Sequence, residues 1–421
     1  MMLDTSHEYD GAAQTVLERC DLLATFSEEP GRVTRRFATP PMHQVHEALS
    51  GWLRAAGMAV EMDAIGNLIG RYEASQPGAP TLLLGSHLDT VRDAGKYDGL
   101  LGVMVALACL ERLAARGERL PFNIELLGFA DEEGLRYQSV YIGSKAMTGR
   151  FDPQALALLD ADGISLADAL RSFGAQPDPV LLTTPRWSPE ALLGYCEVHI
   201  EQGPVLEAQG LPLAVVTSIV GQQRLIFKLR GEQGHAGTLP MGLRHDALCA
   251  AAEFVLEVET LGRSVPGLVA TVGQLQVLPG ASNVVPGEVH LSLDIRHEDD
   301  DLRNRYSSQL YVQAEHICAL RGVRLTCERV QNSRTVFCAP DLVGRWQQAL
   351  RAEGYPVFAL ASGAGHDAVA LSALTAISML FVRCRGGISH HPAEAVLRKD
   401  VAAALAVLER FLLLTAKVVG A

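Results

Sequence analysis

A strand-like segment, a long apolar helix-like segment and a second strand-like segment follow one another between residues 81 and 130. The strands are TLLLGS (81–86) and NIELLGFA (123–130), and the helix between them is GLLGVMVALACLERLAARG (99–117). An earlier segment, 43–57, also has apolar residues at helical spacing. Short apolar strands separated by helices indicate a sheet with both faces covered by helices. The first half of the chain is therefore predicted to be an α/β domain.

The alternation of apolar strands and helices ends near residue 214 and resumes near residue 332. The intervening sequence contains the strand-like RLIFKLRG, an amphipathic helix at 241–262, and the strand-like LVATVGQLQVL and EVHLSLDIRH, with Pro-Gly turns between the strands. Strand, helix and strand pair predict a compact α+β insert, and 421 residues are enough for two domains. We therefore expect a discontinuous catalytic domain formed by 1–213 and 332–421, with a second domain inserted at 214–331.

Charge and composition disfavour several classes of partner. The chain has 48 acidic and 36 basic residues and a formal net charge of −12. Nucleic acid and anionic membrane surfaces are therefore not expected as partners, because both require a basic surface. A small anionic substrate stays compatible, since a few local arginines and histidines can bind it. No segment approaches the roughly 18–20 apolar residues of a membrane span.

The N-terminal sequence and the cysteines favour a cytoplasmic location. The N-terminus is acidic and polar, unlike a secretory signal. The 8 cysteines are far apart and form no C-x-x-C pair. In an acidic chain without a signal sequence, free thiols are the expected state of such cysteines.

Histidine and acidic residues occur where the predicted strands end. SHLDT overlaps the end of the first strand, and DEEG follows the second. Ligands of α/β sheets bind beyond the carboxyl ends of the strands. Taken singly, each of these residues is more simply a strand end, a turn former or a solvated side chain. The candidates are scattered, so that only the fold can gather them: His87, Asp98, Glu132, Glu133, His199 and His390.

The donor types of this set favour divalent metal ions. Imidazole and carboxylate suit Zn²⁺, Mn²⁺ or a similar ion, and no thiolate is positioned nearby. Three histidines and two acids are too many for one open catalytic site but suit two ions bridged by a carboxylate. In an adjacent glutamate pair, one carboxylate could bind metal while the other accepts a proton from water. Asp89 lies two residues after His87 and could accept the second imidazole N–H.

Six segments together resemble the hydantoinase/carbamoylase family of dinuclear metal amidohydrolases. In chain order they are SHLDTV…GKYDGLLGV, FADEEGLRY, EVHIEQGPVLE, GHAGTLPM, ASNVVPGEVHLSLDIR and GAGHDA…GGISHHPAE. They span nearly the whole chain. The resemblance implies an α/β catalytic domain of the di-metal aminopeptidase type. It also implies that the α+β insert is a dimerisation lid, which contributes substrate contacts to the active site of the other subunit of a homodimer.

The resemblance also implies the metal ligands. Asp98 would bridge two divalent ions in each subunit. His87 and His199 would complete the ligands of one ion, and Glu133 and His390 those of the other. Mn²⁺ or Zn²⁺ is expected, with Co²⁺ or Ni²⁺ also compatible with these donors.

Catalytic and substrate-binding roles follow from the same resemblance. Glu132 would be the general base, and Asp89 would orient the imidazole of His87. His235 would stabilise the developing oxyanion. The alternation of EVHLSLDIRH independently places Arg296 on the face opposite the apolar one, where a guanidinium can bind a carboxylate in a bidentate manner. The expected substrate contacts are Gln222, His235, Asn283, Arg296 and Gly365.

The activity implied is hydrolysis of a ureido C–N bond of allantoate, a small anion, giving ureidoglycine, ammonia and CO₂. The alternative is hydrolysis of an N-carbamoyl-L-amino acid, and the shared motifs separate the two poorly. A catalytically silent binding protein on the same scaffold is disfavoured by the complete ligand set. A nicotinamide-dependent oxidoreductase is disfavoured because no G-x-G-x-x-G follows a first strand. Two segments depart from the family pattern. His391 follows His390, and RYQSVYIGS (136–144) would border the site and bear on its specificity.

Overall fold

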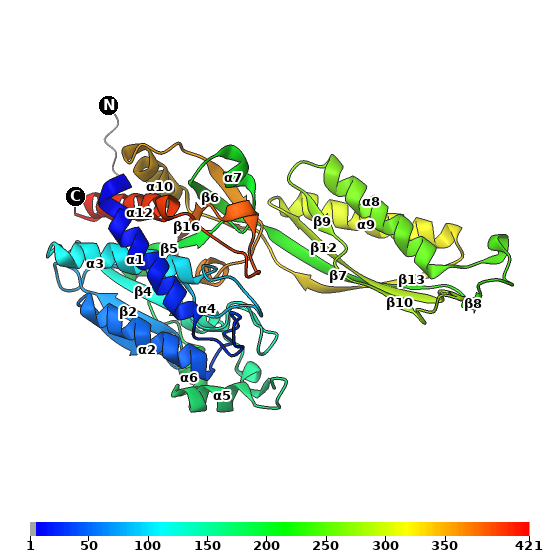
Figure 1. The fold of residues 1–421 in the computed structure, drawn as a ribbon, viewed down its shortest axis with the longest axis horizontal. Coiled ribbons are helices and arrows are strands. Elements are labelled where there is room, and N and C mark those ends of the chain that lie inside the picture. The colour runs from blue at the N-terminus through cyan, green and yellow to red at the C-terminus, as the bar shows by residue number, and fades with distance from the viewer. Residues whose placement is uncertain (1–5, 421) are drawn as a thin grey trace. The chain divides into compact units, whose positions relative to one another are not determined.

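The computed structural model describes residues 6–420, which form two compact units. Unit 1 contains the described residues up to Thr217 and those from Phe337 onward, and unit 2 is Ser218–Val336 (Figure 1). The sequence predicts an insert at 214–331, so both bounds of unit 2 lie a few residues further along the chain. The first bound is later because β6 (Leu213–Ile219) still pairs within the sheet of unit 1.

Unit 1 is built on one mixed sheet with the strand order β1-β2-β4-β3-β5-β16-β6-β14, and β15 pairs with β6. The central strands β4, β3, β5 and β16 run parallel, whereas β1, β2 and β6 pair antiparallel with their neighbours. The α/β prediction is therefore confirmed, with antiparallel strands toward the edges. The other strands are β1 (Ala59–Met62), β2 (Leu68–Tyr72), β3 (Thr81–His87), β4 (Asn123–Phe129), β5 (Leu192–Ile200), β14 (Val336–Phe337), β15 (Ala359–Ser362) and β16 (Ile377–Val382).

Helices bury the centre of this sheet. Every residue of β3 and β4 is buried, and α3 packs against β3 and β5 as well as against α1 and α12. The indole of Trp346 stacks on Phe411 at a centroid distance of 4.0 Å. The helices are α1 (Ser6–Ala24), α2 (Pro40–Ala55), α3 (Leu100–Ala115), α4 (Ile142–Met147), α5 (Leu166–Phe173), α6 (Pro179–Leu182), α7 (Val205–Gln209), α10 (Pro340–Ala352), α11 (Ala368–Leu371) and α12 (Arg398–Val419), with 3₁₀ turns at Pro153–Ala157, Pro189–Ala191 and Arg385–Gly387.

Unit 2 is an antiparallel sheet packed against two helices. The strand order is β10-β12-β7-β13, with β9 also paired to β12. In β12, Val289, Leu291, Leu293 and Ile295 are buried in the core shared with α8 and α9, as the alternation predicts. The elements are β7 (Gly221–Arg230), β8 (Gly234–His235), α8 (Ala247–Ser264), β9 (Val269–Thr271), β10 (Leu275–Leu278), β11 (Val284–Val285), β12 (Glu288–His297), α9 (Asp300–Leu320) and β13 (Arg324–Asn332), with a 3₁₀ turn at Met241–Leu243.

Two features of unit 2 differ from the sequence prediction. The helix predicted at 241–262 begins at Ala247, because the carboxylate of Asp246 accepts the backbone N–H groups that open α8. The second helix α9 and the strand β13 were not predicted at all. Much of α9 is polar, and its core contact comes from a few residues such as Leu310 and Ile317, so that its apolar pattern is weak.

The cysteines and helices agree with two further expectations. All of the cysteines are free thiols, and most of them are buried. Within residues 6–420, no helix has the length and hydrophobicity needed to cross a lipid bilayer.

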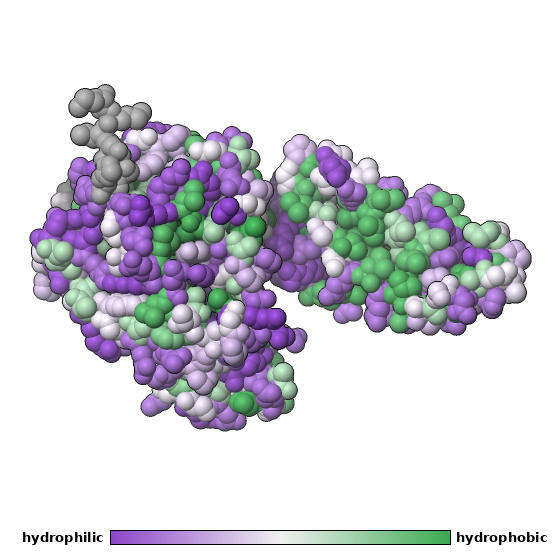
Figure 2. Space-filling view, in the orientation of Figure 1, coloured by the Kyte–Doolittle hydropathy of each residue, from purple (hydrophilic) through white to green (hydrophobic). Residues whose placement is uncertain are grey.

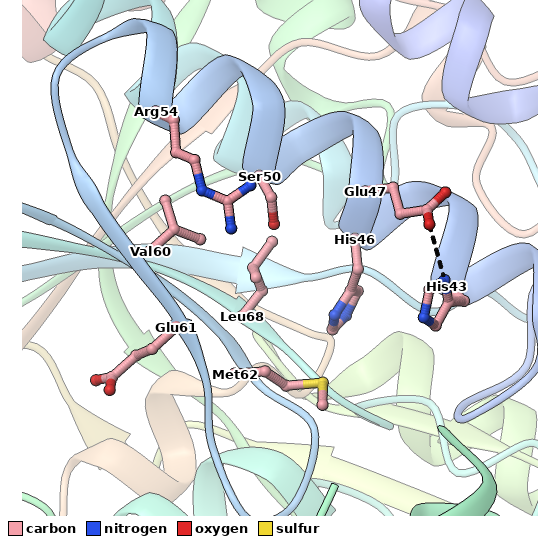
Figure 3. A pocket seen from close by; sticks show the side chains of 9 residues that line it. All are labelled: His43, His46, Glu47, Ser50, Arg54, Val60, Glu61, Met62 and Leu68. Carbon is pink, nitrogen blue, oxygen red and sulfur yellow. Dashed lines mark ion pairs between the residues drawn. The ribbon is translucent and has the colours of Figure 1, made fainter. Parts of the chain in front are cut away.

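A pocket of about 280 Å³ lies between α2 and the first two strands, and none of the predicted metal ligands lines it (Figure 3). His46 of α2 lines it, is only 7% exposed, and packs edge-on against the ring of Phe173 at 5.0 Å. Burial, together with the neighbouring His43, lowers the pKa of His46 to about 3. The imidazole of His46 is therefore neutral in the folded protein near neutral pH.

This buried histidine should destabilise the fold in acid. The unfolded chain binds a proton at His46 below about pH 6.5, whereas the folded chain does so only near pH 3. The contribution of His46 is therefore complete above pH 6.5 and is lost as the pH falls. As the pH falls from 6 to 4, we expect the difference in free energy of unfolding between His46→Leu and wild type to shift by about 2 to 3 kcal/mol in favour of the variant. Urea unfolding at each pH measures this difference, and a difference that is independent of pH would contradict the expectation.

Candidate metal centre

The predicted ligands meet at one edge of the sheet of unit 1. Because β4, β3, β5 and β16 are parallel neighbours, their carboxyl ends lie along the same edge. His87 is the last residue of β3, and His199 is next to last in β5. The segment 131–133 follows β4, and His390 lies in the connection from β16 to α12. The sheet topology therefore gathers residues as far apart in the sequence as His87 and His390.

Asp98, two residues before α3, is at the centre of the cluster. Its Oδ1 lies 3.7 Å from Nε2 of His87 and 3.2 Å from Nε2 of His199. Its Oδ2 lies 3.1 Å from Nε2 of His390. Gly99 makes this approach possible, since its φ is 65° and a Cβ there would lie 2.5 Å from the ring of His87. One carboxylate thus faces three imidazoles, with each oxygen turned to a different part of the cluster.

Backbone carbonyls fix the orientation of two of these imidazoles. Nδ1 of His87 lies 2.9 Å from the carbonyl oxygen of Asp89, and Nδ1 of His199 lies 2.9 Å from that of Ile200. Hydrogen bonds at Nδ1 require the proton there and leave the Nε2 lone pair directed at Asp98. Both rings therefore present the nitrogen that a metal ion would use.

The carboxylate of Asp89 has a different role from the one the sequence predicts. It lies 3.8 Å from Nδ1 of His87, so the carbonyl and not the carboxylate holds the ring. Its two oxygens accept the backbone N–H groups of Glu132 at 3.0 Å and Glu133 at 3.1 Å. Asp89 thus ties the end of β3 to the segment that carries the glutamate pair.

The donor set fits divalent metal ions. The ligand atoms of His87, Asp98 and His199 lie within 4.8 Å of one another, as do those of Asp98, Glu133 and His390. Among the described residues, Oδ1 of Asp98 and Nε2 of His199 are buried polar atoms without a hydrogen-bond partner. Such atoms are costly unless satisfied, and a cation between them would satisfy both. Two triads that share Asp98 are therefore suited to hold metal.

Electrostatics support the same interpretation. Burial opposes ionisation of Asp98, but the neighbouring imidazoles of His390, His87 and His199 hold its pKa well below the usual value. Conversely, hydrogen bonds to Asp98 and Glu133 raise the pKa of His390 to about 10. The carboxylates therefore create a strong negative potential at this sheet edge, and a bound cation would be stabilised by it.

Glu132 lies beside the triads in a buried position. Its side chain is 8% exposed, and one of its oxygens lies within 4.8 Å of ligand atoms of His87 and Glu133. Burial raises the pKa of Glu132 well above the usual value, and Glu133 and Asp367 raise it further, while His87 lowers it. A buried carboxylate with strengthened proton affinity next to a metal site is suited to accept and return a proton.

Three residues that the sequence analysis did not select also belong to the centre. The amide of Gln202 and the hydroxyl of Ser389 each donate to Oδ2 of Asp98 at 2.9 Å. The carboxylate of Glu394 accepts the backbone N–H of Asp98 at 3.1 Å, and its Oε2 lies 3.2 Å from the hydroxyl oxygen of Ser389. Their positions in the sequence could have indicated Gln202 and Ser389, because each lies within three residues of a predicted histidine ligand and in the same motif.

Of the predicted substrate contacts, Gly365 is in unit 1, between β15 and α11, and the others are in unit 2. Arg296 of β12 lies directly opposite Gln222 of β7 in the sheet. His235 pairs through β8 with the strand that follows Asn283, and the carbonyl of Asn283 accepts the N–H of Ala236 at 3.0 Å. Unit 2 therefore holds these four residues as two separate pairs.

Comparisons with known proteins agree with this site. The model of the peptidase family M20/M25/M40 matches residues 83–414. A probable allantoate deiminase of Oryza sativa subsp. japonica is 39% identical over 95% of this chain and 87% of its own length. An N-carbamoyl-L-amino acid amidohydrolase of Geobacillus stearothermophilus is 41% identical over 90% and 92%, respectively.

A crystal structure of an amidase of the hydantoinase/carbamoylase family from Burkholderia multivorans superposes with a TM-score of 0.90. It is 31% identical, and the match covers 96% of this chain and 98% of that one. The resemblance drawn from the sequence motifs is thereby confirmed, as is the fold class. The chain belongs to the peptidase family M20/M25/M40, as a hydrolase of the hydantoinase/carbamoylase amidase group.

Proposed function

We propose that this enzyme hydrolyses a ureido C–N bond of allantoate, giving ureidoglycine, ammonia and CO₂, as a cytoplasmic step of purine catabolism. The observation that carries the proposal is the Asp98 carboxylate facing three imidazoles with Glu132 beside it. Relatives named allantoate deiminase share 39% of their residues with the chain. Hydrolysis of an N-carbamoyl-L-amino acid is the second candidate, because relatives with that activity in their names are equally similar.

In this proposal the two triads hold two divalent ions. His87, His199 and Asp98 would bind one ion, and Asp98, Glu133 and His390 would bind the other. We infer Mn²⁺ or Zn²⁺, with Co²⁺ or Ni²⁺ compatible, because imidazole and carboxylate donors accept all of these. When bound, the ions polarise the ureido carbonyl and make a water molecule more acidic.

The protein groups bind the substrate and move the proton. Glu132 accepts a proton from the attacking water and returns it to the nitrogen that leaves as ammonia. The imidazole of His235 stabilises the oxyanion. Arg296 and Asn283 bind the substrate carboxylate, with the guanidinium able to make a bidentate contact. Weaker roles in substrate binding are assigned to Gln222 and Gly365.

The layout of unit 2 favours a homodimer for this chemistry. Arg296 pairs with Gln222 at one end of the β12–β7 pairing, and Glu288 pairs with Arg230 at the other end. Arg296 and Glu288 are eight residues apart in β12, which corresponds to about 26 Å at 3.3 Å per residue. The loop that carries His235 and Asn283 lies beyond that far end. One copy of unit 2 is therefore unsuited to bring both pairs to one small substrate, whereas two copies could each supply one pair.

Exposed apolar side chains support such an interface. Figure 2 shows hydrophobic residues gathered on the face of unit 2 that carries α8. Large apolar side chains of unit 2 that are more than half exposed include Leu256, Val269, Val312 and Leu320. Contiguous apolar surface on a folded domain is typical of a protein–protein contact. We therefore infer that unit 2 mediates dimerisation.

A substrate panel tests the proposed reaction. The purified enzyme, reconstituted with Mn²⁺, Zn²⁺ or Co²⁺, should release ammonia from allantoate with a kcat/KM above that for N-carbamoyl-L-amino acids. Chelator-treated enzyme is the control and should be inactive until metal is restored. The reverse preference would establish the second candidate. Ammonia release from none of the ureido compounds with any metal would refute both.

A further inference from the structure

Tyr141 lies next to the proposed base although nine positions separate them in the chain. The backbone N–H of Tyr141 donates to the carbonyl of Glu132 at 3.2 Å, and that of Gly143 donates to the carbonyl of Ala130 at 2.8 Å. The segment therefore runs alongside the strand end that carries the glutamate pair. Tyr141 has a φ of 61°, which is unusual for a bulky residue and is found where the surrounding structure imposes it.

The hydroxyl of Tyr141 reaches the second segment implicated in substrate binding. Its oxygen lies 1.9 Å from the position that a Cβ on Gly365 would occupy, so only glycine leaves room for it. The ammonium of Lys145 lies 5.7 Å from the ring centroid and helps to hold the ring in place. No hydrogen bond joins this hydroxyl to any protein group between residues 6 and 420.

The hydroxyl is able to donate as well as accept a hydrogen bond. Burial raises the pKa of Tyr141 above its usual value, and the carboxylates of Glu132 and Asp367 raise it further. The group therefore keeps its proton. The Tyr141 side chain is half-buried, so its hydroxyl can bond to a water molecule or to a ligand that replaces the water.

We propose that Tyr141 is a specificity-determining residue, whose hydroxyl hydrogen-bonds a polar group on the part of the substrate that is not cleaved. The inference rests on the proposed function and deepens it. Allantoate carries a second ureido group on its central carbon, with N–H donors and a carbonyl acceptor. An N-carbamoyl derivative of an apolar amino acid carries only hydrocarbon there and would leave the hydroxyl unpaired. Sites that hydrogen-bond a substrate group discriminate strongly against analogues that lack it.

The test compares wild type with Tyr141→Phe on allantoate and on N-carbamoyl-L-leucine. The variant keeps the ring and its contact with Lys145. We expect kcat/KM for allantoate to fall about 10- to 100-fold, mainly through KM, while that for N-carbamoyl-L-leucine stays the same or rises. Tyr137→Phe is the matched control, because the Tyr137 hydroxyl in the same segment donates to the carbonyl of Ser165 at 3.4 Å. Its ratio of the two kcat/KM values should equal that of wild type.

The wild-type enzyme and the variant test different statements. If wild type hydrolyses neither compound, the proposed function fails. If wild type hydrolyses allantoate and Tyr141→Phe keeps the same ratio, only the role of Tyr141 fails. An equal fall for both compounds, carried by kcat, would also overturn it, because it would show that Tyr141 acts by positioning Glu132.

A second pair of variants probes the contact with Gly365. Gly365→Ala places a methyl group 1.9 Å from the Tyr141 oxygen but 3.2 Å from its Cζ. The single variant should lose activity on both compounds. Adding Tyr141→Phe relieves most of the clash and should restore hydrolysis of N-carbamoyl-L-leucine but not of allantoate. Recovery of allantoate hydrolysis to the wild-type level in the double variant would overturn the proposal.

Discussion

Glu132→Gln is expected to abolish turnover while the protein keeps its full metal content. Glutamine has the size of glutamate but cannot accept the proton of the attacking water. General acid–base catalysis contributes about 10²- to 10⁴-fold, and Glu132 would act both on the water and on the leaving nitrogen, so a loss of kcat near the upper limit is expected. Steady-state ammonia release measures the rate, and elemental analysis of the same preparation measures the bound metal.

The adjacent residue provides the matched control. Glu133 belongs to a triad with Asp98 and His390, so Glu133→Gln should lose one ion as well as activity. Glu132 also has an oxygen within ligand distance of His87 and Glu133. Loss of metal from Glu132→Gln would therefore show that Glu132 is a ligand, and retention of turnover would place the base elsewhere.

The gathering of the predicted ligands follows from features that are visible in the sequence. TLLL and NIELL are short apolar strands separated by an apolar helix, and that pattern requires parallel neighbours whose carboxyl ends coincide. His87 and the segment 131–133 follow those ends directly, so their proximity is a consequence of the sheet. His199 and His390 could be placed only through the family motifs, because β5 and β16 are far along the chain.

The details that the sequence could not predict depend on local backbone conformation. Asp89 was expected to orient His87 with its carboxylate, but the chain turns so that its carbonyl faces the ring. Gln202 and His390 have φ values of 57° and 55°, in the left-handed region that residues other than glycine rarely adopt. The pattern of apolar and polar residues does not predict this conformation. In α9 the polar residues outnumber those that reach the core, which conceals the helix.

The proposed metal donors and most of the proposed substrate contacts lie in different units of the fold. In unit 1, His87 and His199 stand on buried parallel strands, and Asp98, Glu133 and His390 lie in segments that follow strands of the same sheet. Rigid support of this kind suits a reaction centre. The residues proposed to recognise the substrate carboxylate come from unit 2, a separately folded sheet with its own core. The residues proposed to select the substrate are thus largely separate from the proposed metal donors, and Tyr141 and Gly365 are those proposed within unit 1.

Asp98→Asn is expected to lose both metal ions, in contrast to variants of any other ligand. Both triads contain Asp98, whereas His390 belongs to only one of them. The amide removes the negative charge that faces His87, His199 and His390, so neither ion would be neutralised.

A ligand that binds only the folded state stabilises it by about 2.7 kcal/mol at a concentration 100 times its Kd. Added Mn²⁺ or Zn²⁺ should therefore raise the melting temperature of wild type strongly, that of His390→Ala less, and that of Asp98→Asn not at all. Thermal unfolding combined with elemental analysis measures both quantities. Two ions retained by Asp98→Asn would show that the sites do not depend on a shared carboxylate.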